Sequence, residues 1–171
     1  MSTSHSARQP AEAIRIARAA LTDDVSRTLI ESLNAELTGA HPEPRANFGL
    51  DPAEASDGRG AFLVVYHEEN PVGCGAVRLL DSETAELKRM YVAPAARGKG
   101  LGRRLVAALE TEARALGVRR LVLETGIRQQ AALALYRATG FEPIPLYGEY
   151  LHSPETSICL GKVFAQAAQP D

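Results

Sequence analysis

The chain has 171 residues, of which 45% are hydrophobic and 23% charged, and its formal net charge is −2. This length and composition suit one globular domain that buries its own core. The slightly acidic balance argues against a general nucleic-acid-binding protein, which is usually basic. No apolar run approaches the roughly 18 residues of a membrane-spanning helix, and the N-terminus lacks the apolar segment of a secretory signal. We therefore expect a cytoplasmic protein whose partners include neither nucleic acid nor membrane.

The two cysteines, Cys74 and Cys159, lie in apolar, strand-like contexts, and no metal-type spacing relates them. The sequence contains neither a C-x-x-C pair nor an H-E-x-x-H motif, so we expect no metal site. Both cysteines are expected to be reduced residues of the core.

In chain order, residues 1–11 are polar and predict a disordered tail. Residues 12–165 predict a single domain, and residues 166–171 predict a frayed C-terminus. Ile14 and Ile16 alternate with arginines, which predicts a short strand. A helix follows, capped by Thr22, Asp23 or Asp24 and ended by Gly39, with its apolar face formed by Val25, Leu29, Leu33 and Leu37. Residues 41–60 are rich in Pro, Gly and Asp and predict a long loop with room for a short helical piece.

Residues 61–68, 72–81 and 84–93 predict three strands, and their short connections indicate an antiparallel meander that Pro94 ends. Helical spacing then runs from Leu101 to Leu116, with Gly117 as the stop. A strand over 119–125 and a helix over 129–140 follow, and residues 141–150 and 156–164 are two final strand candidates. This order predicts one mixed α/β domain.

The sequence "RGKGLG" at residues 97–102 joins the third strand of the meander to the next helix. Glycines let a backbone approach a ligand closely, and amides at a helix start have no internal partners. Together with the nearby arginines they predict a phosphate site, although a tight turn with solvated basic residues is an open alternative. The string matches neither a P-loop nor a dinucleotide-binding fingerprint, because the required residues fall at other positions.

The spacing R-x-x-G-x-G closely resembles the acyl-CoA pyrophosphate loop of the GNAT N-acetyltransferase superfamily. Downstream, "ALALYRATGF" is similar to that family's A-x-x-L-Y…G-F pattern, with Gln129 where an asparagine is usual. The resemblance covers roughly residues 61–162, and the earlier residues fit by element order alone. It implies the GNAT fold: a mixed, mostly antiparallel central sheet of about seven strands, splayed between strands 4 and 5 and flanked by about four helices.

The resemblance also implies that acetyl-CoA is the co-substrate. Loop amides and Arg97 would hold the pyrophosphate, Arg103 or Arg104 would reach a phosphate or stay solvated, and the pantetheine arm would pair with the backbones of Met90 and Val92. The expected coenzyme-binding residues are Met90, Tyr91, Val92, Arg97, Gly98, Lys99, Gly100, Leu101, Gly102, Arg103, Gln129 and Tyr136.

Two residues are the expected catalytic groups. Tyr136 occupies the family's common general-acid position, where a phenol would protonate the leaving thiolate; the alternative is that it only packs between helix and sheet. Glu86 is the best candidate for the base, and the alternative is an ion pair with Arg78 or Lys88. Strand periodicity puts Glu86, Lys88, Met90 and Val92 on one face unless a bulge intervenes, and a bulge is usual in this family.

The acceptor site is expected to involve Arg45, Phe48, Tyr147 and Tyr150, while His41, His67 and His152 are weaker catalytic candidates. No sequence feature identifies the acceptor amine. We expect an acetyl-CoA-dependent N-acetyltransferase that transfers directly to an amine of a small molecule or peptide; the alternative is a non-catalytic acyl-CoA-binding or regulatory module. Homodimers are common in the family, so a second copy of the chain is a further candidate partner.

Overall fold

The computed structural model describes residues 13–40 and 49–165. Over these ranges it contains a seven-stranded sheet of order β1-β2-β3-β4-β5-β7-β6. The strands are β1 (Ile14–Arg18), β2 (Gly60–His67), β3 (Asn70–Leu79), β4 (Thr84–Val92), β5 (Arg120–Gly126), β6 (Glu142–Ile144) and β7 (Ser157–Val163). Every neighbouring pair is antiparallel except β4 and β5, which are parallel. The mixed, mostly antiparallel sheet predicted from the sequence is confirmed.

Three α-helices flank the described part of the sheet, where the resemblance implied about four. They are α1 (Asp24–Ala40), α2 (Leu101–Ala115) and α3 (Gln130–Ala138). Three short 3₁₀ helices accompany them, η1 (Pro52–Ala55), η2 (Pro94–Ala96) and η3 (Gly148–His152). The first of these is the helical piece expected in the long loop. No helix in the described ranges is both long and apolar enough to span a bilayer.

The predicted strand over residues 141–150 is wrong for most of its length. β6 has only three residues, and residues 148–152 form η3 instead. Pro145 supplies no N–H to a strand ladder, so pairing with β7 ends at Ile144. β6 is the last strand of the sheet, which explains why Pro143 is tolerated within it.

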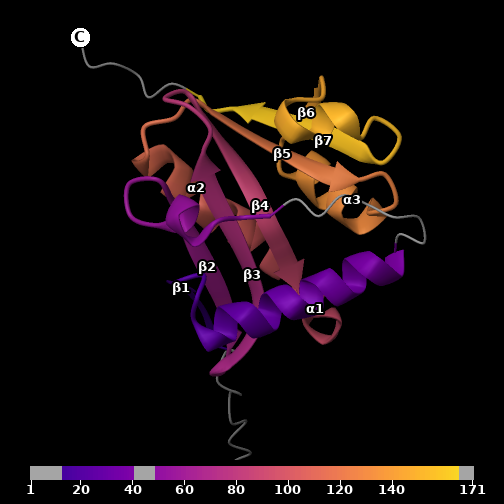
Figure 1. Ribbon diagram of the computed structural model, residues 1–171. Coiled ribbons are helices and arrows are strands. Elements are labelled where there is room, and N and C mark those ends of the chain that lie inside the picture. Colours follow the sequence, from indigo (N-terminus) through magenta and orange to yellow (C-terminus); the bar gives the residue numbers. More distant parts are fainter. Residues whose placement is uncertain (1–12, 41–48, 166–171) are drawn as a thin grey trace, which may run out of the picture.

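Helices cover both faces of the sheet (Figure 1), and each face has its own apolar cluster. Leu29 of α1 packs with Phe62, Val64, Cys74 and Ala76 on one face. On the other face, α2 and α3 pack against β2–β5 through a larger cluster that includes Leu63, Val65, Val77, Leu87, Leu105, Leu109, Leu133 and Tyr136. Both cysteines are buried and free, as expected.

A bulge in β4 reverses the faces of its side chains. Cys74 pairs with Tyr91 and Ala76 with Lys88, so the single residue Gly75 lies opposite two β4 residues. The extra residue is accommodated at Arg89, which has φ +57°. Glu86 and Lys88 therefore share the face that carries α1, whereas Met90 and Val92 pack into the α2 cluster. The four residues were expected on one face unless a bulge intervened, and the bulge is present between Lys88 and Met90.

β4 and β5 separate after a short stretch of pairing. Their parallel register runs only from Thr84 opposite Arg120 to Leu87 opposite Leu123, although β4 continues to Val92. Among the described residues, no strand pairs with the β5-facing backbone edge of residues 88–92. This is the splay that the family resemblance implies.

Gly75 provides the space that the bulge needs. A Cβ atom at this position would lie 2.6 Å from the Met90 sulfur and 2.7 Å from Leu109 Cδ1. We predict that Gly75→Ala lowers the free energy of unfolding by about 1–3 kcal/mol, because the core is already filled. Gly39→Ala is the matched control, since nothing lies within 4 Å of its Cβ position, and it should not lower stability. Urea unfolding measures both; equal stability of the two variants would contradict the prediction.

Candidate active site

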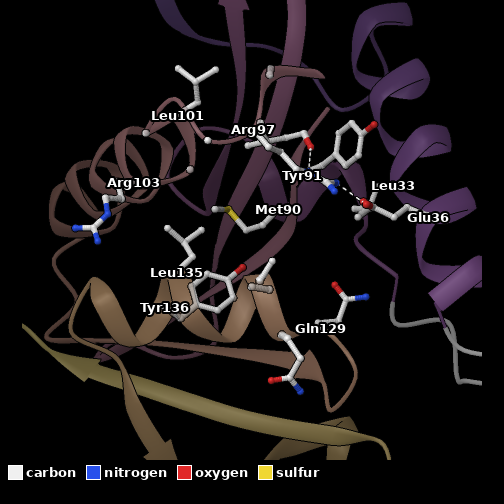
Figure 2. A pocket seen from close by; sticks show the side chains of 18 of the residues that line it. Leu33, Glu36, Met90, Tyr91, Arg97, Leu101, Arg103, Gln129, Leu135 and Tyr136 are labelled. Carbon is white, nitrogen blue, oxygen red and sulfur yellow. Dashed lines mark hydrogen bonds and ion pairs between the residues drawn. The ribbon is translucent and has the colours of Figure 1, made fainter. Parts of the chain in front are cut away.

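A cavity of about 580 Å³ opens where β4 separates from β5 (Figure 2). Its walls come from α1, the end of β4, the loop leading into α2, and the start of α3. Eleven of the twelve residues expected to bind the coenzyme line it: Met90, Tyr91, Val92, Arg97, Gly98, Gly100, Leu101, Gly102, Arg103, Gln129 and Tyr136. Lys99 is exposed and is not among the lining residues. The structure thus brings together two sequence motifs that are about thirty residues apart.

The glycine loop leaves helix amides open toward this cavity. Gly98 and Gly100 have φ values of +79° and +77°, a conformation that side chains other than glycine rarely adopt. Gly100 directly precedes α2, where no side chain caps the helix and no acidic residue occupies the first turn. The positive end of the helix dipole is therefore uncompensated within the described chain. These residues fit a bound polyphosphate, which would accept hydrogen bonds from the first amides of α2.

Gly102 allows α2 and α3 to approach each other beside the loop. A Cβ atom there would lie 3.0 Å from Leu135 Cδ2. The third glycine of the motif therefore serves helix packing, while the first two serve backbone conformation.

Arg97 lies inside the cavity and is paired there. Its Nε donates to the Val92 carbonyl oxygen at 2.9 Å, and its Nη2 donates to the Glu36 carboxylate of α1 (Figure 2). Leu33 and Glu36 both line the cavity, and sequence reasoning missed them. Their spacing of three residues puts them on one helix face, but only the path of α1 across β4 reveals what that face meets. Arg128 also lines the cavity and was not predicted.

Tyr136 is buried on α3, and its hydroxyl points into the cavity toward Met90 (Figure 2). Its ring packs edge-on against Phe141, with 5.8 Å between ring centroids. Burial raises the pKa of Tyr136 above its ordinary value of about 10, so the phenol stays protonated at neutral pH. The residue therefore combines the packing role with a proton that faces the cavity.

Glu86 is fully buried on β4 and does not line this cavity. Arg78 Nε donates to its Oε1 at 2.9 Å, and the Tyr147 hydroxyl donates to its Oε2 at 2.5 Å. Lys88 Nζ lies 3.7 Å from Oε1. The ion pairs weighed as the alternative for Glu86 are thus present, and any proton transfer to it must pass through a neighbouring group.

The network continues to the surface through η3. Lys88 Nζ donates to Glu149 Oε1 at 2.9 Å and to the Gly49 carbonyl oxygen at 3.2 Å. Burial is the main cause that raises the pKa values of Tyr147 and Tyr150, and the Glu86 carboxylate raises them further. Both expected acceptor-site tyrosines therefore lie beside Glu86. The other two expected acceptor residues, Arg45 and Phe48, lie outside the described residues, as does His41.

Comparison with known proteins gives consistent matches. The model of the acetyltransferase (GNAT) family matches residues 26–141. IAA acetyltransferase from Azospirillum brasilense is 40% identical over 143 residues, which are 82% of this chain and 92% of that protein. A crystal structure named as an acyl-CoA N-acyltransferase from Klebsiella pneumoniae has a TM-score of 0.73 and 34% identity, covering 88% of this chain and 97% of that one. A GNAT acetyltransferase from Elizabethkingia anophelis with acetyl-CoA bound shares the fold, with a TM-score of 0.63 and 18% identity, covering 88% and 98% of the two chains.

The contact between Arg97 and Glu36 yields a test. Any anion that binds at the glycine loop competes with Glu36 for the Arg97 guanidinium, and both side chains are partly exposed. We predict that Glu36→Gln tightens coenzyme A binding by about two- to fivefold, the range expected for a solvent-exposed ion pair. Glu31→Gln, an exposed change on the same helix, should leave the dissociation constant unchanged. Calorimetric titration measures both; weaker binding to Glu36→Gln would show that Glu36 supports the site.

Proposed function

The chain belongs to the acetyltransferase (GNAT) family, and we propose that it transfers an acetyl group from acetyl-CoA directly to the amine of a small molecule or peptide. The observation that carries the proposal is the cavity in which the glycine loop, the unpaired edge of β4 and the Tyr136 hydroxyl face one another. Acetyl-CoA supplies an activated thioester. The residues of this chain position it and move protons.

Binding of the coenzyme uses backbone groups. Amides at residues 98–102 and the start of α2 would hold the pyrophosphate, with Arg97 turning to it from Glu36. The edge of β4 beyond Leu87 would pair with the pantetheine arm as an added strand does. An amide of this edge would also donate to the thioester carbonyl oxygen, where negative charge develops during transfer.

Neither cysteine is suited to carry the acetyl group as an acyl-enzyme, which favours direct transfer to the amine. The reactive form of a cysteine is the thiolate, and burial raises the pKa of Cys74 to about 12, so its thiol stays protonated. Burial also raises the pKa of Cys159, and neither cysteine lines the cavity. In the proposed reaction the amine nitrogen forms a bond to the carbonyl carbon and the carbon–sulfur bond breaks. Tyr136 gives its proton to the departing sulfur.

The amine must also lose a proton. Glu86 cannot touch the amine directly, because Arg78 and Tyr147 cover its two oxygens. We propose that the Tyr147 hydroxyl accepts the amine proton while passing its own to Glu86 Oε2. Burial and Glu86 raise the pKa of Tyr147, which keeps this hydroxyl protonated as a relay requires.

Thiol release from acetyl-CoA with a panel of amines, amino acids, aminoglycosides and peptides tests the function. We expect release that depends on one class of amine. Coenzyme A binding without release for any amine would instead favour the non-catalytic acyl-CoA-binding module.

Tyr136→Phe tests the acid. Removing the hydroxyl should lower kcat by about a hundredfold or more, with little change in the KM for acetyl-CoA, because the proton is needed only as the sulfur leaves. Tyr66→Phe, on β2 and outside the cavity lining, is the matched control. An unchanged kcat for Tyr136→Phe would remove Tyr136 from the mechanism.

Tyr147→Phe tests the relay and leaves the Glu86 carboxylate in place. We predict that kcat falls at least about tenfold at pH 7. The defect should shrink as the pH rises above the pKa of the acceptor amine, because the proton that must leave before attack is then already lost and only the proton released after attack remains. A pH–rate profile of the variant and the wild type measures this. A defect of constant size at every pH would indicate a structural role instead.

A further inference from the structure

Arg89 is a half-buried cation without an acidic partner in residues 13–40 and 49–165. Its Nη1 donates to the side-chain oxygen of Asn34 at 3.3 Å, a contact with a neutral group. Two other arginines near the site are ion-paired: Arg78 with Glu54 and Glu86, and Arg97 with Glu36. Arg89 thus differs from these two arginines in that no carboxylate of the described residues contacts its guanidinium.

Arg89 and Asn34 do not line the cavity themselves, but each is next in sequence to a residue that does. The next residue along β4 is Met90, and the residue before Asn34 on α1 is Leu33; both line the cavity. The guanidinium that joins Arg89 to Asn34 therefore bridges β4 and α1 at the cavity rim. Arg89 is one of the two bulge residues of β4 that lie opposite Gly75.

The surroundings make this cation a good anion-binding group. Burial lowers the pKa of Arg89, although arginine stays charged at neutral pH. A partly desolvated guanidinium gains most from a carboxylate, which it can bind through two parallel hydrogen bonds. Nothing in the described chain supplies that carboxylate, so a ligand is the natural source.

The network of charged side chains around Glu86 carries a net negative charge. The carboxylates of Glu54, Glu86 and Glu149 contact the cations of Arg78 and Lys88, which leaves one negative charge in excess. Glu149 is half-exposed, and both it and Tyr150 act electrostatically on Arg89. These carboxylates lie outside the cavity lining and offer an acidic region for an ammonium group, while Arg89 is a separate cation on the same strand as Glu86 and Lys88.

We propose that Arg89 binds the carboxylate of the acceptor, so that the substrate is a small amino carboxylate such as an amino acid. The inference rests on the proposed acetyl transfer to an amine. Arg89 fixes the carboxylate at the rim of the cavity, and the amino group reaches the Tyr147 hydroxyl and the thioester carbon.

Pairs of L-amino acids and their C-terminal amides test this, because each pair differs in the negative charge alone. With saturating acetyl-CoA, the wild type should use the acids at least about tenfold better in kcat/KM than the amides, as a charge-assisted hydrogen bond warrants. In Arg89→Gln the KM for the acids should rise by about ten- to hundredfold, with kcat retained and the amides unaffected. Arg89→Lys keeps the charge but loses the bidentate geometry, so its KM for the acids should lie between those of the wild type and Arg89→Gln.

Arg27→Gln, an exposed change on α1, is the matched control and should alter neither substrate class. Titration of the amino acids into the coenzyme A complex gives the same comparison without turnover, and urea unfolding verifies that each variant folds. Amides used as well as acids, or an equal loss for both in Arg89→Gln, would overturn the inference and leave acetyl transfer intact. If no amine releases thiol, the proposed function fails, and the titration still decides whether Arg89 binds carboxylates.

Discussion

The extra residue in β4 is the constraint on which the rest of the site depends. It lets one strand present Glu86 and Lys88 to the α1 face and, a few residues later, Met90 and Val92 to the α2 face. Over the same residues β4 leaves β5, so its backbone edge becomes available to a ligand. In the proposed reaction, the side chains that act on an acceptor and the backbone that holds coenzyme A thus come from one short segment. Gly75 makes this arrangement sterically feasible on the neighbouring strand.

Charge is distributed unevenly around this segment. A fully buried carboxylate such as Glu86 costs several kcal/mol to desolvate unless it is well paired, and here Arg78 and Tyr147 supply the pairing. On the coenzyme side, the start of α2 and the glycine loop carry positive potential with no acidic residue in the first turn. The protein therefore satisfies its buried acid internally, and in the proposed function the open helix terminus and Arg89 bind ligands. This division matches a two-substrate reaction in which one substrate is a polyphosphate.

Local sequence signals predicted much of this structure. The motif at residues 97–102 and the pattern around Tyr136 each encode a local conformation, and both lie in the cavity as expected. Contacts between elements far apart in the sequence could not be predicted in the same way. Glu36 gives no sign in the sequence that it meets Arg97, because the path of α1 over β4 depends on packing of the whole sheet. The bulge at Arg89 has no glycine to mark it in β4, and so the residues alone left the face of Met90 open. Pro145 was a visible signal for the end of β6 that the strand prediction overlooked.

The central claim is that the open edge of β4 and the glycine loop together hold coenzyme A. An NMR titration of the isotope-labelled full chain with coenzyme A tests it most directly, because each backbone amide reports separately. We predict saturable shifts that are largest at Gly98, Gly100 and Gly102 and extend to Met90 and Val92. Binding that leaves these amides unmoved, or shifts confined to one of the two segments, would contradict the account.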